Sequence, residues 1–311
     1  MFFHVNAAAP HGQELRESCA LIFGPNLWAG GIMAKRQVAS ILSLALLCGS
    51  LWAAPYTLPP TVSAGERLAS ERASPGLDYN DPVPLVCPGR DEVRIATIKV
   101  NPDVLLDVYW PAGEIASPLP IVLFIVELPR SRYLDSVGKP FRKYVPVVSW
   151  AADIAARGMI AVVPDPATPR RDYPLLLDWL EVNGSSLGMD PKRQAYFCPG
   201  YACAFLPFVA GLPSSNNVKA LVLYYGAITP EMGLRLRPDI ALLWAKVGMG
   251  SYLTKHYPAM VKEIQAYKDQ GNPVEIIDMP NSYPYFDWKQ LDAESASVLE
   301  RTLVFLENHL R

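Results

Sequence analysis

The chain has 311 residues, half of them hydrophobic, and its 28 Lys and Arg nearly balance its 30 Asp and Glu. This length and composition suit one globular domain with a tail. The formal net charge of −2 and the dispersed basic residues exclude the basic field that holds a polyanion, so we expect no nucleic-acid partner. Nothing in the sequence predicts a cofactor or a metal site.

Residues 33–54 have the layout of a secretory signal peptide. Lys35 and Arg36 precede an uncharged apolar run from Val38 to Ala54, which ends in small residues before a proline. The run is shorter than the roughly 20 residues that cross a bilayer, and its small-residue end suits cleavage near residue 54. We therefore expect a periplasmic or secreted protein with no stable membrane span after cleavage. Residues 1–32 show no coherent periodicity and are interpreted as lying upstream of the true start.

The expected mature protein starts with a segment that has few large apolar residues. Residues 55–84 are rich in Pro, Ser and Gly, a composition typical of a loosely ordered segment. We therefore place the folded domain at residues 85–311.

Three cysteines remain after cleavage, Cys87, Cys198 and Cys203. An oxidising compartment permits disulfides, but an odd number leaves at least one thiol free. The sequence leaves open whether any pair is bridged or whether all three are small buried residues.

Eight segments read as strands. Residues 92–100 and 103–111 carry β-branched and aromatic residues around Asn-Pro-Asp, which predicts an antiparallel hairpin. The other six are continuous apolar runs, which are typical of strands buried on both faces of a parallel sheet. They span residues 120–126, 159–164, 194–198, 218–225, 240–247 and 274–279.

Helical patterns alternate with these runs. They span residues 145–158, 172–184, 201–211, 258–270 and 290–309, and two of them are ended by glycine. A hairpin followed by six strand–helix units predicts an α/β fold, with a mostly parallel sheet of about eight strands and helices on both faces.

Several stretches resemble the α/β-hydrolase fold family, and within it the dienelactone hydrolase-like and esterase-like branch. They follow one another in the family's order and spacing: LLDVYWPAG, LPIVLFIV, AADIAARGMIAVVPD, LGMDPKRQAYF, VKALVLYYG, LRPDIALLWAKVGMG and PYFDW. The resemblance covers residues 93–310. It implies the α/β-hydrolase fold, a Ser or Cys nucleophile with an acid and a histidine, and activity on esters or lactones.

The nucleophile position of the family departs from its pattern here. The family carries Gly-x-[Ser/Cys]-x-Gly at a strained turn between a strand and a helix. One alignment places this motif on CPGYA and the nucleophile on Gly200, and another places it on GYACA and the nucleophile on Ala202. Neither residue supplies an oxygen or a sulfur. A further shift of one residue reaches Cys203, which would then lie inside the helix.

The other catalytic positions depart as well. The acid position holds Gly250, and the histidine position, two residues before Phe286, holds Pro284. The loop whose backbone N–H groups stabilise an oxyanion in the family contains Glu127, and a carboxylate opposes such a charge. The leading hypothesis is therefore an exported pseudoenzyme without catalytic residues, which binds a small apolar ligand or an envelope protein.

The expected binding site lies beyond the carboxyl ends of the strands, where open α/β sheets place their sites. The residues expected there are Glu127, Arg130, Tyr201, Gly250, Tyr283 and Tyr285. The tyrosines equally suit half-buried packing with the hydroxyl in water. Glu127 with Arg130 or Arg132 equally suits a solvated ion pair.

Two other functions stay open. One is an active esterase or lactone hydrolase with a relocated site, in which Cys203 is the nucleophile and His256 or Glu127 the base. The apolar residues around Cys203 argue against this, because a reactive thiolate needs an exposed setting and a lowered pKa. The other is an interaction protein of the cell envelope that uses its whole surface, because the fold does not decide the function.

We predict that the mature protein begins near residue 54, because cleavage follows the small residues that end the apolar run. N-terminal sequencing of the protein isolated from its native envelope or medium measures this directly. A cytoplasmic protein that keeps Met1 contradicts the prediction.

Overall fold

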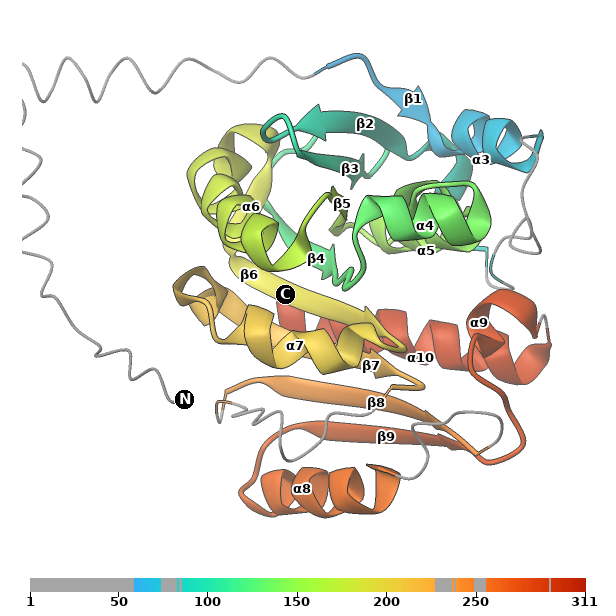
Figure 1. Ribbon diagram of the computed structural model, residues 1–311, viewed down its shortest axis with the longest axis vertical. Helices are drawn as coiled ribbons and strands as arrows, with labels where there is room; N and C mark the ends of the chain where they lie inside the picture. The colour runs from blue at the N-terminus through green and yellow to red at the C-terminus, as the bar shows by residue number, and fades with distance from the viewer. Residues whose placement is uncertain are drawn as a thin grey trace, which may run out of the picture. The chain divides into compact units, whose positions relative to one another are not determined.

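One mixed β-sheet of nine strands runs through the domain (Figure 1). The computed structural model describes residues 59–73, 83, 86–226, 237, 239–248, 256–290 and 292–311. The expected signal segment, the residues upstream of it and Gly250 lie outside this part of the chain. Among the described residues, no helix has the length and apolar character needed to cross a membrane.

The strand order is β1-β2-β3-β5-β4-β6-β7-β8-β9. The pairs β1·β2, β2·β3 and β3·β5 are antiparallel, and the remaining neighbours in this order are parallel. The mostly parallel sheet predicted from the sequence is confirmed, including its antiparallel hairpin of β2 and β3. The strands are β1 (Val62–Ser63), β2 (Arg94–Lys99), β3 (Val104–Trp110), β4 (Leu119–Phe124), β5 (Ile160–Pro166), β6 (Met189–Pro199), β7 (Val218–Tyr224), β8 (Ala241–Val247) and β9 (Val274–Met279).

The parallel strands are apolar throughout because both faces of the sheet are covered. In β4, Val122 and Phe124 belong to one core cluster, whereas Ile121 and Leu123 belong to the other. Successive side chains of a strand point to opposite faces, so an uninterrupted apolar run fills two cores at once.

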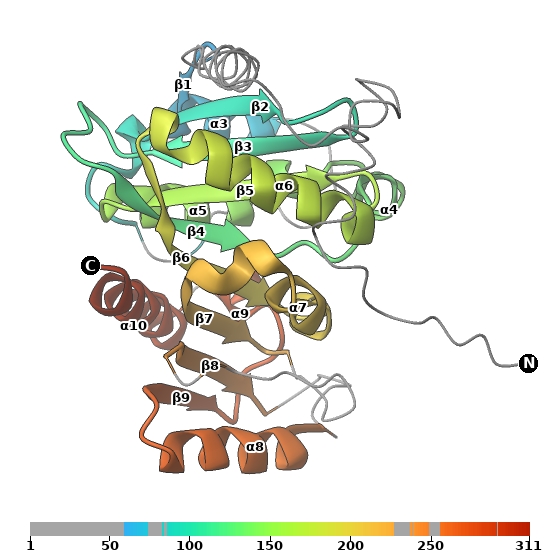
Figure 2. The same ribbon diagram turned by 90° about the vertical axis from the view of Figure 1, so that its left-hand side faces the viewer.

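Helices from different parts of the chain cover the two faces. The cluster on one face includes residues of α5 and α10, and the cluster on the other includes residues of α6, α7 and α8; Figure 2 shows α7 and α10 on opposite sides of β7. These five helices confirm the five predicted ones. The helices are α3 (Ala64–Ala73), α4 (Arg130–Val137), α5 (Val145–Ala156), α6 (Pro169–Asn183), α7 (Ala202–Ala210), α8 (Tyr257–Asp269), α9 (Phe286–Lys289) and α10 (Ala293–Leu310).

Part of the segment 55–84, which its composition suggested to be loosely ordered, forms β1 and α3. The hydroxyl of Ser63 accepts the N–H of Glu66 at 3.2 Å, and the Glu66 carboxylate accepts the N–H of Ser63 at 2.8 Å. This reciprocal capping box fixes the first turn of the helix. Ala64 and Leu68 then bury their side chains in the core, so a cap and two apolar contacts outweigh the polar composition.

The three cysteines are free thiols with buried side chains. The Sγ of Cys203 donates to the carbonyl oxygen of Cys198 at 3.0 Å. The Sγ of Cys87 lies on the other face, where Arg157 Nε donates to it at 3.4 Å. The structure thus has the unbridged one of the two arrangements that the sequence left open.

Gly226 follows β7 at a place where a larger residue has no room. A Cβ here would overlap Cys203 Sγ and the backbone oxygen of Gly200. We predict that Gly226→Ala lowers the free energy of unfolding by about 3 kcal/mol or more, because a strand or a helix must shift. Chemical denaturation measures the loss.

Gly271→Ala is the matched control for this substitution. Gly271 has φ +85 and open space around it, so only backbone strain of about 1 kcal/mol is expected. A loss at Gly226 no larger than at Gly271 contradicts the prediction.

Candidate functional site

The connection from β6 to α7 turns sharply at Gly200. This residue has φ +57, its N–H donates to Tyr224 O at 2.8 Å, and its carbonyl accepts the N–H of Cys203 at 3.2 Å. A side chain is strained at such a φ, so glycine suits the corner. Ala202, the other residue that the sequence alignment offered for this position, is the buried first residue of α7.

A tyrosine that the sequence analysis did not select covers this corner. A Cβ on Gly200 would lie 3.4 Å from Tyr225 Cε2. Tyr225 has φ +40 and Tyr285 has φ +66, the only positive φ values of non-glycine residues in the described part. Their rings lie 5.2 Å apart. Backbone strain of this kind collects at functional sites, so the two tyrosines mark the corner as a candidate site.

Asp287 is a fully buried carboxyl behind these tyrosines. Its Oδ2 accepts the Trp150 Nε1–H at 3.0 Å, whereas its Oδ1 has no hydrogen-bond partner among the described residues. Burial raises the pKa of Asp287 to about 7, although the Trp150 hydrogen bond lowers it in part. Burial and, second, the charge of Asp287 raise the pKa of Tyr225. A carboxyl and a phenol thus lie together in the core behind the corner.

Glu127 lies in the loop after β4. Burial raises its pKa to about 7, and a hydrogen bond with Tyr133 opposes the shift. Burial and, second, the charge of Glu127 raise the pKa of the Cys203 thiol well above its usual range. Cys203 is fully buried, so it is a protonated core thiol rather than a reactive thiolate.

The backbone of the same loop is occupied. The N–H of Val126 donates to the Tyr173 hydroxyl at 2.7 Å, and this hydroxyl in turn donates to the Phe124 carbonyl oxygen at 3.3 Å. An oxyanion site needs free N–H groups aimed at the developing charge. The Val126 amide is therefore engaged inside the protein.

Arg130 corrects the expectation of an ion pair with Glu127. Its Nε lies 2.8 Å from Asp165 Oδ2, and its Nη2 donates to Asp165 O at 2.7 Å. Asp165 lies near the end of β5, next to β4, and is almost fully buried, so it offers a less screened partner than Glu127 does. Arg132 is exposed and pairs with no acidic residue among those described.

Solved structures with the same architecture were found. No protein-family model and no curated protein matches the sequence. An α/β-hydrolase enzyme, MGS-M1, from a Medee basin deep-sea metagenome library aligns with a TM-score of 0.53 and 16% identity over 70% of this chain and 98% of its own. Esterase LipW from Mycobacterium marinum aligns with a TM-score of 0.53 and 15% identity, over 79% of this chain and 86% of its own. A bacterial heroin esterase aligns with a TM-score of 0.52 and 14% identity, over 79% and 98%.

The chain has the α/β-hydrolase fold. At these identities the likeness is one of fold, and the chemistry of this chain has to be argued from its own residues. In this fold the nucleophile stands at the turn from a strand to a helix, which is the kind of turn that Gly200 forms after β6.

The other expected site residues lie in different surroundings. Tyr201 and Tyr283 are half exposed, at 52% and 54% of their surface. Tyr285 is partly buried and packs on Trp288, with ring centres 5.4 Å apart. Pro284 is part of the turn before α9. Tyr201 and Tyr283 can therefore meet a ligand in solution, whereas Tyr285 serves the packing around Tyr225.

Neither histidine of the expected mature chain is joined to the corner at Gly200 by a hydrogen bond between described residues. His309 packs on Phe305 near the end of α10, with ring centres 4.6 Å apart. It lines a small pocket with Glu275. Glu275 lies near the start of β9, whereas the corner at Gly200 follows the end of β6, so this pocket lies at the other end of the parallel strands. His256 precedes α8, and no hydrogen bond joins it to Cys203. No group of three His, Cys, Asp or Glu in the described ranges could hold a metal ion.

The buried Asp287 carboxyl should make stability depend on pH. Its pKa is 3.8 in its ordinary state and about 7 when folded, so between these values the folded state holds a proton that the unfolded state has released. The free energy of unfolding therefore falls as the pH rises from about 4 to 7, by a few kcal/mol in order of magnitude. We predict that Asp287→Asn removes this part of the slope in urea unfolding.

Asp292→Asn is the control for this measurement. The Asp292 side chain caps α10 by accepting the Ser295 N–H at 2.8 Å, and this bond lowers its pKa. Asp292 therefore titrates below the window, and asparagine also caps helices well, so its variant should keep the wild-type slope. An unchanged slope in Asp287→Asn contradicts the assignment of the proton to Asp287.

Proposed function

We propose that this protein is an exported, non-catalytic α/β-hydrolase-fold protein that binds a small apolar ligand or an envelope protein. The observation that carries the proposal is the corner at Gly200. The strand, the turn and the helix of a nucleophile elbow are present, and the residue at the turn has no side chain. The solved structures of similar fold include enzymes described as esterases, so the proposal separates this chain from them by its site.

The surroundings of the corner support a loss of several groups together. The Val126 amide bonds to Tyr173, Glu127 occupies the same loop, and Pro284 stands where the family has its histidine. A catalytic triad acts as a unit, so each missing member lowers the value of the others. One missing group could reflect a shifted alignment, whereas the combination favours a site that has changed its role.

The relocated hydrolase is the weaker alternative. It needs Cys203 as an accessible thiolate, but this thiol is fully buried, donates to a backbone carbonyl and has a raised pKa. These three properties favour a structural role for the side chain.

Exposed aromatic side chains support a binding role. Tyr201 directly follows the corner and is 52% exposed, and Tyr283 precedes Pro284 and is 54% exposed. Tyrosine presents an apolar ring and a polar tip, which makes it common in contact surfaces. We assign these two tyrosines to contacts with the ligand or the envelope partner.

We predict that the purified mature protein does not hydrolyse a panel of activated esters and lactones above background. Gly200→Ser should not restore turnover, because a serine without an assisting base is a weak nucleophile. The assay combines turnover with labelling by a fluorophosphonate and by iodoacetamide, with the bacterial heroin esterase as positive control.

Stoichiometric fluorophosphonate labelling at one site would show an active nucleophile and overturn the proposal. So would turnover that is abolished by Cys203→Ala. Native mass spectrometry of protein isolated from the envelope addresses the binding role: a bound molecule or protein supports it, and a bare chain argues against it.

A further inference from the structure

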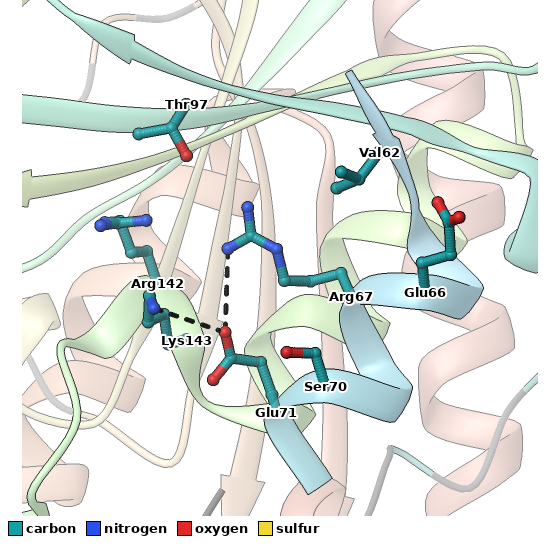
Figure 3. A pocket seen from close by; sticks show the side chains of 8 residues that line it. All are labelled: Val62, Glu66, Arg67, Ser70, Glu71, Thr97, Arg142 and Lys143. Carbon is teal, nitrogen blue, oxygen red and sulfur yellow. Dashed lines mark ion pairs between the residues drawn. The ribbon is translucent and has the colours of Figure 1, made fainter. Parts of the chain in front are cut away.

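An open pocket of about 540 Å³ lies between α3, β2 and the short 3-10 helix η3 (Phe141–Lys143) (Figure 3). Its volume falls within the range of sites for small molecules. None of its lining residues belongs to the loops around Gly200, so it is distinct from the candidate site above. The lining residues are Val62, Glu66, Arg67, Ser70, Glu71, Thr97, Arg142 and Lys143.

Arg142 is an anchored guanidinium in this pocket. Its Nη1 donates to both carboxylate oxygens of Asp107, at 3.0 and 3.1 Å, and its Nε donates to Asp165 Oδ2 at 3.1 Å. Nine-tenths of the side chain is buried, and the two aspartates are almost fully buried. These bonds fix the plane of the guanidinium and leave its Nη2 without a bond to any described residue.

The Arg67 guanidinium on α3 points toward the same space (Figure 3). Its Nη1 donates to Asp107 Oδ2 at 3.2 Å, and its Nε and Nη2 make no hydrogen bond to a described residue. The ammonium of Lys143 lies 3.7 Å from Glu71 Oε1, and the Lys143 side chain is 38% exposed. Three cations from two elements thus line one pocket, and the two guanidinium groups keep unused donors.

The cations of the pocket belong to one set of ion pairs, and a separate carboxylate, Glu66, also lines the pocket. Burial alone would lower the pKa of Arg142, but Asp107 and Asp165 raise it above its ordinary value, so the group stays charged. The Glu66 carboxylate accepts the N–H and the hydroxyl of Ser63, which lower its pKa, so it stays charged and balances the fourth cation. The other groups form one set of ion pairs, in which four cations face three carboxylates. The cations are Arg67, Arg130, Arg142 and Lys143, and the carboxylates are Glu71, Asp107 and Asp165.

We propose that this pocket binds a small soluble molecule through a carboxylate group, held by the unused N–H groups of Arg67 and Arg142 and by the Lys143 ammonium. A planar guanidinium matches a carboxylate through two parallel hydrogen bonds. The Glu66 and Glu71 carboxylates also line the pocket, and they repel a phosphate dianion more strongly than a monoanion. The proposal does not depend on whether the corner at Gly200 is catalytic.

The test is an isothermal titration of the mature chain with propionate and with L-lactate, at constant ionic strength. We expect saturable binding that Arg67→Gln weakens at least tenfold and Lys143→Gln weakens about threefold. Arg72→Gln is the matched control, because Arg72 is an exposed residue of the same helix outside the pocket lining. It should bind both acids as the wild type does.

Heat signals that sodium chloride reproduces, or equal weakening in Arg67→Gln and Arg72→Gln, would overturn the proposal. Tighter binding of inorganic phosphate than of propionate would overturn the assignment of the ligand as a carboxylate. Circular dichroism checks that each variant is folded. If Arg67→Gln does not fold, Lys143→Gln decides, since the partly exposed Lys143 side chain pairs with Glu71 and with neither of the buried aspartates. Unchanged binding in Lys143→Gln would overturn the proposal.

Discussion

The close approach of β6, β7 and α7 is the constraint on which the candidate site depends. Gly226 has no room for a Cβ between Cys203 Sγ and the Gly200 carbonyl oxygen. This contact holds the start of α7 against the end of β7 and forces the chain to turn at Gly200 with φ +57. The strain that a side chain would suffer at the corner is avoided by glycine, so the sharp turn from β6 to α7 is made at a residue without a side chain.

Strain appears instead in the two tyrosines that surround the corner. Tyr225 and Tyr285 hold positive φ values, and ring contacts to each other and to their aromatic neighbours Trp288 and Phe286 offset the cost of this conformation. The buried Asp287 carboxyl lies behind them with Trp150 as its hydrogen-bond donor. The centre of the site is thus an aromatic cluster with one buried carboxyl, whose pKa burial raises to about 7.

Most of the sheet could be predicted from the sequence, because strands buried on both faces are continuous apolar runs. The start of β6 could not, since polar residues and a proline follow Met189, and the register with β4 shifts between Asp190 and Gln194. At the corner, Gly200 and Ala202 are both small, and only the backbone conformation distinguishes them. Tyr225 and Asp287 gave no signal, because the sequence shows an aromatic or an acid without showing what surrounds it. Ser63 and Glu66 have the spacing of a capping box, but the polar composition of residues 55–84 favoured a loosely ordered segment over a helix.

The ion pairs under α3 also reach the loop of Glu127. Asp165 Oδ2 lies 2.8 Å from Arg130 Nε and 3.1 Å from Arg142 Nε, so one carboxylate oxygen joins the floor of the pocket to the first residue of α4. Arg130 stands three residues after Glu127. Because one oxygen serves two guanidinium groups in a nearly dry environment, a change in the position of Arg142 alters the partner of Arg130. Helix α3 is therefore connected through charges, rather than through apolar packing alone, to the loop that borders the corner.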